Sequence, residues 1–213
     1  MRDCTLALRI VLVIALVLTI SCSEADRRCE CVPLVPLAVG NSWVYRSCTV
    51  DQPGGESHCW GQDTIRVMSV GDLAGEDYYL TNCLMAFRET PDGVSLVGHE
   101  SLRVVAYDYF FRFPVADGAS YRYTTTKVAF PSMLYWVEEE VVDVPAGQYP
   151  VFTYHVSIAR GLPEETLSFS PGVGLVQDRY THGQAVFIWE LVSAHLAGTG
   201  MQSVGQGNGI CDP

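Results

Sequence analysis

The sequence predicts an all-β protein, with about ten antiparallel strands in a sheet that curves into a barrel or half-barrel. The first observation is that apolar and polar residues alternate with a period of two from Asn41 onward, as in the run from Tyr107 to Phe113. The second is that segments rich in Pro and Gly, which are typical of turns, separate these stretches. The third is that no long window shows the spacing of an amphipathic helix. A single β domain over 34–197 is therefore expected.

The segment Pro36–Arg46, PLAVGNSWVYR, opens this domain. Its Gly and Asn predict a turn directly before a strand in which Trp43 and Tyr45 alternate with other residues. A weaker copy, PVADGASYRYT, begins at Pro114. The copy favours a domain built from a duplicated half, with 36–113 and 114–197 as the two halves. The alternative is that strands separated by Pro-Gly turns align with one another by chance.

Segments with the strand pattern follow one another along the domain, and Asp51–Ser57 and Pro145–Gly147 are among the turns between them. The predicted strands are Trp43–Val50, Cys59–Val70, Tyr78–Arg88, Val94–Gly98, Leu102–Phe113, Tyr121–Val128, Leu134–Val144, Tyr149–Ala159, Glu164–Phe169, Gly174–Tyr180 and Ala185–Ala197. The first two are expected to form a hairpin.

The N-terminus predicts export. The apolar run Ile10–Ile20 follows a short charged region and is too short to span a bilayer, so residues 1–21 are predicted to be a cleaved signal peptide. Thr19-Ile20-Ser21-Cys22 resembles the lipobox of bacterial lipoproteins, with Thr in place of the usual Leu. It predicts Cys22 as the lipid-bearing first residue of the mature protein, with residues 22–33 as a tether. The alternative is an ordinary signal peptide followed by a chance cysteine.

Cysteine counting agrees with the lipid anchor. Of eight cysteines, Cys4 leaves with the signal peptide and Cys22 would carry lipid, which leaves an even number for disulfides in an oxidising compartment. The hairpin predicts one pair, and the last cysteine would staple the glycine-rich tail, 198–213, to one of the others. Zinc ligation by Cys31, His58 and Cys59 is disfavoured because the spacing matches no closed zinc motif. The disulfide candidates are Cys48 with Cys59, and Cys211 with Cys29, Cys31 or Cys83.

Three motifs resemble those of a group of uncharacterised bacterial secreted proteins and lipoproteins. They are P-L-x-x-G-x-x-W-x-Y at Pro36–Tyr45, P-A-G-x-[FY] at Pro145–Tyr149 and P-G-V-G-L-V at Pro171–Val176. The resemblance covers about Pro33 to Ala197 and implies an antiparallel β-sheet protein of the cell envelope. It brings no catalytic residues, and the cysteine-rich ends are not part of the pattern.

No catalytic, cofactor-binding or metal-binding pattern is predicted. The sequence has no G-x-S-x-G or H-E-x-x-H signature, and Gly172-x-Gly174 precedes a strand rather than the helix that a phosphate-binding loop needs. The acidic run Glu138–Glu140 is expected on a solvated strand. Nucleic acid is a poor partner, because a formal net charge of −11 repels phosphate groups.

These observations favour a non-enzymatic lipoprotein of the bacterial cell envelope, anchored to a membrane outside the cytoplasm. Aromatic side chains on the strands are expected either to fill the core or, as our functional hypothesis, to line a concave pocket for an apolar small molecule or lipid. The pocket candidates are Tyr107, Tyr109, Phe111 and Trp136. The alternative is a structural or assembly role with an envelope protein as partner. A third, disfavoured hypothesis is a hydrolase that uses His155 or His182 with a carboxylate.

The lipid anchor predicts the mass of the mature protein. Protein extracted from its own membrane should begin at Cys22 and carry acyl groups, and Cys22→Ser should release it in soluble form. Intact-mass spectrometry of both proteins checks this. A mature N-terminus at Ser23 or later would contradict the anchor.

Overall fold

The computed structural model describes residues 32–50, 55–73, 75–101, 104–125, 132–158 and 165–197. The chain forms two compact units, and every described strand belongs to the unit Pro33–Ile210. The predicted signal peptide, Cys22 and the glycine-rich tail lie outside the described residues, as do Cys29, Cys31 and Cys211. Within the described ranges, no helix is long and apolar enough to cross a membrane.

The described part of the chain forms twelve strands in one antiparallel sheet, which confirms the predicted fold class. The segment 78–88, predicted as one strand, is two strands joined by a turn at 82–84, where Leu84 has a φ of 58°. The strands are β1 (Ser42–Val50), β2 (Ser57–Leu73), β3 (Glu76–Thr81), β4 (Met85–Thr90), β5 (Gly93–Ser101), β6 (Val104–Arg112), β7 (Ser120–Thr124), β8 (Ser132–Val144), β9 (Gly147–Ile158), β10 (Glu165–Ser170), β11 (Gly174–His182) and β12 (Ala185–His195).

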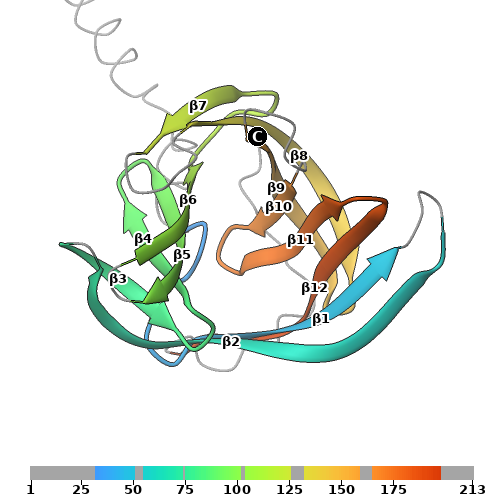
Figure 1. Ribbon diagram of the computed structural model, residues 1–213, viewed down its shortest axis with the longest axis horizontal. Helices are drawn as coiled ribbons and strands as arrows, with labels where there is room; N and C mark the ends of the chain where they lie inside the picture. The colour runs from blue at the N-terminus through green and yellow to red at the C-terminus, as the bar shows by residue number, and fades with distance from the viewer. Residues whose placement is uncertain are drawn as a thin grey trace, which may run out of the picture. The chain divides into compact units, whose positions relative to one another are not determined.

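The sheet consists of two six-stranded meanders. Its order is β6-β5-β4-β3-β2-β1-β12-β11-β10-β9-β8-β7, so β1 pairs with β12 in the middle and β6 and β7 are the two edge strands. Figure 1 shows the sheet of this unit curling around an interior, which brings β6 back toward β7. Each meander is a run of neighbouring hairpins, and the chain passes from one to the other through 113–119.

The segment at Pro36 and its copy at Pro114 form the same turn. In the first, the Gly40 N–H donates to the Val67 carbonyl and the Val67 N–H to the Asn41 carbonyl, both at 2.9 Å. In the second, Gly118 and Ala119 make the same two bonds with Val137, again at 2.9 Å. Both glycines have positive φ, 95° and 70°, which glycine adopts without a steric penalty. Each turn thus ties the start of one meander to the second strand of that meander.

Two of the three sequence motifs contact one another. The Trp43 Nε1–H donates to the Val173 carbonyl at 2.6 Å, and the Tyr45 hydroxyl donates to the Leu175 carbonyl at 2.8 Å. The Gly172 N–H also donates to the Pro33 carbonyl at 2.7 Å. A side chain at Gly174 would meet the Trp43 ring 3.4 Å away. The aromatic strand and the Pro-Gly turn are therefore one packing unit.

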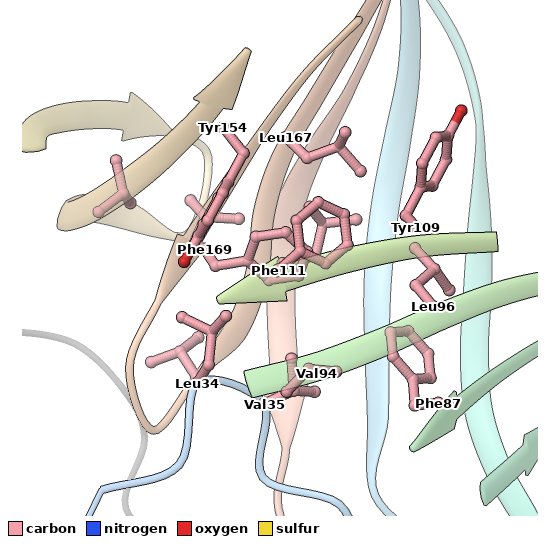
Figure 2. Packing of buried hydrophobic residues seen from close by; sticks show 14 of the residues in the cluster. Leu34, Val35, Phe87, Val94, Leu96, Tyr109, Phe111, Tyr154, Leu167 and Phe169 are labelled. Carbon is pink, nitrogen blue, oxygen red and sulfur yellow. The ribbon is translucent and has the colours of Figure 1, made fainter. Parts of the chain in front are cut away.

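The interior is filled with large apolar side chains where the chain enters the sheet. Leu34 and Val35, which precede β1, lie beneath Phe111, Tyr154 and Phe169 (Figure 2). The Phe111 ring is fully buried, and its centroid lies 4.7 Å from that of Phe169 and 5.1 Å from that of Tyr154. This cluster draws side chains from both meanders and so packs them together.

Tyrosine hydroxyls join the two edges of the sheet. We call this set of contacts the tyrosine seam: Tyr121 of β7, Tyr135 of β8 and Tyr154 of β9, all bonded to the β6 backbone. The Tyr121 hydroxyl accepts from the Arg112 N–H at 3.1 Å and donates to the Phe110 carbonyl at 2.8 Å. Tyr135 accepts from the Phe110 N–H at 3.1 Å, and Tyr154 donates to the Arg112 carbonyl at 2.6 Å.

The seam also contains a buried carboxylate. The Asp108 side chain of β6 accepts from the hydroxyls of Tyr123, at 3.1 Å, and Thr125, at 2.7 Å. An edge strand carries a row of unpaired backbone groups that invites pairing with other chains. In this protein, side-chain hydroxyls satisfy the outward backbone groups of Phe110 and Arg112.

Replacing Tyr121 by Phe is expected to destabilise the fold by about 1–3 kcal/mol, because two backbone groups of β6 lose their partner. Tyr180→Phe is the matched control, since the Tyr180 hydroxyl makes no hydrogen bond with any described residue, and it should cost less than about 0.5 kcal/mol. Urea unfolding of both variants measures the difference. Equal midpoints for the two variants would show that the seam does not stabilise the sheet.

Candidate functional site

The aromatic residues predicted on β6 lie in the interior of the curled sheet. Phe111 and Tyr109 are buried, and Tyr107 is half-buried. The Tyr107 and Tyr109 rings stack with centroids 5.2 Å apart, and Phe111 packs into the apolar cluster described above. Phe111 therefore belongs to the core, whereas the two tyrosines lie nearer to polar groups.

Trp136 does not join these residues, contrary to the predicted pocket. Its neighbours Tyr135 and Val137 are buried, and successive strand residues point to opposite faces, so Trp136 projects from the outer face of β8 with 43 % of its surface exposed. The period of two predicts this strand, but the prediction that Trp136 faces the concave side is wrong. The four predicted residues consequently do not line one site.

The outer face of β7, β8 and β9 carries a depression of about 660 Å³ around Trp136. Leu134, 48 % exposed, lies two residues away on the same strand and the same face. We call this hollow the outer-face depression. It is lined by Ser120, Tyr121, Arg122, Leu134, Tyr135, Trp136, His155, Val156 and Ser157.

His155 is held beside Trp136 by two contacts. The two residues are register partners on β9 and β8, with ring centroids 4.7 Å apart and planes tilted by 34°. The His155 Nε2 also lies 3.1 Å from the Glu138 Oε2. Among the described residues, no hydroxyl or thiol is hydrogen-bonded to His155, so the histidine and carboxylate of the hydrolase hypothesis meet without a nucleophile. The side chain of His182 lies outside the description.

A second polar group, which no sequence motif marks, lies in the interior. Glu165 of β10 and Asp178 of β11 are diagonal neighbours on one face, because Glu165 is opposite Tyr180 and Asp178 is opposite Leu167. The Tyr109 hydroxyl donates to the Glu165 Oε2 at 2.5 Å across the interior. The Asp178 Oδ1 is buried without a hydrogen-bond partner, and no described Arg, Lys or His pairs with either carboxyl.

Burial raises the pKa of both carboxyl groups. For Asp178 the pKa lies well above its ordinary value, first because of desolvation and second because of the negative charge of Glu165. For Glu165 desolvation also raises the pKa, and the hydrogen bond from Tyr109 partly opposes it. Burial likewise raises the pKa of Tyr107 and Tyr109, whose hydroxyls face the negative charge of Glu165. Such a pair of like charges favours the presence of at least one proton.

The described cysteines comprise one disulfide and one thiol. Cys48 and Cys59 are register partners on β1 and β2, and their sulfurs are bonded at 2.02 Å, as the hairpin predicted. Cys83 lies exposed in the turn between β3 and β4 and is bonded to no described cysteine. No group of three or more His, Cys, Asp or Glu side chains in the described ranges could hold a metal ion.

Asp178→Asn is expected to alter the pH dependence of stability. A carboxyl whose pKa is raised in the folded state stabilises the fold below its unfolded pKa, near pH 4, and this contribution is lost as the pH rises through the folded pKa. The free energy of unfolding of Asp178→Asn relative to the natural protein should therefore increase with pH above about 4. Urea unfolding across this range measures it, with Asp143→Asn on the exposed part of β8 as control. Parallel profiles for all three proteins would contradict the buried pair.

No family model and no curated protein matches the sequence. Two solved structures align with 78% of this chain and 100% of their own chains. One is described as a "putative exported protein" with a YmcC-like fold from Bacteroides fragilis, at 14% identity and a TM-score of 0.42. The other is described as a "putative lipoprotein" from Parabacteroides distasonis, at 13% identity and a TM-score of 0.39. At these values the likeness carries no statement about the activity, ligand or location of this chain.

Proposed function

We propose that this protein is a non-enzymatic lipoprotein of the bacterial cell envelope, anchored through Cys22, that binds a saccharide on the outer face of β7–β9. The location is supported by the apolar N-terminal run, by the lipobox-like residues before Cys22 and by the even number of remaining cysteines. The disulfide between Cys48 and Cys59 suits an oxidising compartment outside the cytoplasm.

The observation that carries the binding role is the exposure of Trp136 and Leu134 side by side within the outer-face depression. Both are large apolar side chains with more than a third of their surface in water. An exposed indole offers a flat apolar surface, and burying such surface against a ligand gains about 25 cal/mol per Å². A sugar ring has an apolar face formed by its C–H groups, which can cover the indole.

The rim of the outer-face depression supports a saccharide over a lipid. Ser120, Ser157, Arg122 and His155 surround the two apolar side chains with hydrogen-bonding groups. A saccharide presents hydroxyls around its apolar face and can use this rim, whereas a lipid chain would leave these groups without partners. In the interior, the Phe111 ring has no exposed surface for a lipid chain, because Tyr154 and Phe169 pack against it.

The test is a titration with an N-acetylglucosamine tetramer, followed by NMR of the tryptophan indole signals. A saturable shift of the Trp136 signal is expected, and Trp136→Ala should abolish binding at millimolar saccharide. Trp60→Ala is the matched control and should leave binding unchanged, because Trp60 is also an exposed tryptophan (51 %) but lies on β2, outside the outer-face depression. Absence of a saturable shift, or equal loss in the two variants, would overturn the proposal.

A further inference from the structure

A second depression, of about 300 Å³, lies over the tyrosine seam where β6 meets β7. We call it the seam groove. It adjoins the outer-face depression, because Tyr121 and Arg122 line both. The seam groove is lined by Arg88, Thr90, Asp92, Ser95, Phe110, Arg112, Tyr121, Arg122 and Tyr123.

Two of the three arginines in the seam groove form no ion pair with a carboxylate in the described part of the chain. Arg88 forms an ion pair with Glu76 at 2.5 Å and also lies over the Tyr78 ring. Arg112 and Arg122 form no ion pair with any described residue, and both are exposed. In a chain with a formal net charge of −11, two guanidinium groups in one groove that form no ion pair with a described carboxylate make a local positive surface.

The fold holds Arg112 in position before any ligand arrives. Its N–H and carbonyl are bonded to the hydroxyls of Tyr121 and Tyr154 in the seam. Its guanidinium lies over the Tyr121 ring, 4.7 Å from the centroid. Arg122 projects from the neighbouring strand β7 two residues before Thr124, opposite Leu134. Because these contacts already hold the guanidinium of Arg112, that side chain loses little conformational entropy on binding.

We propose that the seam groove binds a carboxylate group of the saccharide, through Arg112 and Arg122, so that the ligand is an acidic saccharide. This rests on the proposed function, because the same ligand would place an apolar ring face on Trp136. A planar guanidinium matches a carboxylate with two parallel N–H···O bonds, and such charge-assisted bonds are stronger than those to hydroxyls. The groove contains one carboxylate of its own, Asp92, and its charge opposes but does not cancel the two guanidinium groups.

The experiment compares two tetrasaccharides by isothermal titration calorimetry. One is the neutral N-acetylglucosamine tetramer, and the other alternates N-acetylglucosamine with glucuronate. The acidic probe is expected to bind at least about tenfold more tightly, and its affinity should fall as salt is added. Arg112→Gln should remove most of this preference and leave the affinity for the neutral probe unchanged, because Arg112 does not line the outer-face depression. Arg122→Gln, which also removes a group from the rim of that depression, should weaken binding of both probes and of the acidic probe more. Arg112→Lys, which keeps the charge but not the planar fork, should restore part of the preference.

Arg179→Gln is the control, since Arg179 is an exposed arginine of β11 that lines neither depression. It should leave both affinities as they are. Equal binding of the two probes by the natural protein, or an acidic preference that survives both arginine substitutions, would overturn this inference and leave the proposed function standing. Absence of binding by both probes would overturn the proposed function and this inference with it.

Discussion

The tyrosine seam is the constraint on which the rest of the structure depends. A twelve-stranded sheet that curls on itself ends in two edge strands, and the backbones of β6 and β7 do not pair. The hydroxyls of Tyr121, Tyr135 and Tyr154 take the place of the missing strand ladder by satisfying the outward groups of β6. Because a tyrosine side chain is longer than a backbone hydrogen bond, the two strands are held apart. The seam groove is a consequence of that separation, and the tyrosine that closes the sheet also supports the guanidinium of Arg112.

The interior is divided between apolar packing and a costly polar group. Leu34, Val35 and Phe111 fill the space near the chain entry, and their burial favours folding. Glu165 and Asp178 oppose it, because desolvation of two like-charged groups without a cation is unfavourable above the pH at which they lose their protons. The only described hydrogen bond to the pair, from Tyr109, crosses from β6 to β10 and so links the two meanders. The polar pair therefore both costs stability and joins parts of the sheet that the strand ladder does not.

The fold class can be predicted from the sequence because it depends only on local signals. A period of two and turns with Gly or Pro determine where strands begin and end, and they also placed Cys48 opposite Cys59. The same signals identified the two turns that share one hydrogen-bond pattern at Gly40 and Gly118. The turn at 82–84 was not predicted because it contains neither Gly nor Pro. Its Leu84 adopts a positive φ, a conformation that glycine adopts more readily.

The candidate site could not be read from the sequence, because its residues meet only after the sheet has curled. A period of two states which side chains share a face, but it does not state which face is the interior, and the prediction for Trp136 is wrong for that reason. Arg112 and Arg122 are close in sequence, but the segment that begins at Pro114 and opens the second half lies between them. The sequence therefore does not show that their strands lie beside each other at the seam and that both arginines line one groove. Glu165 and Asp178 look like ordinary polar residues of alternating strands until Tyr109 reaches them from β6. Closure of the sheet thus determines both which polar groups are buried and which arginines share a groove, and a local pattern does not state which side chains meet when a curved sheet closes.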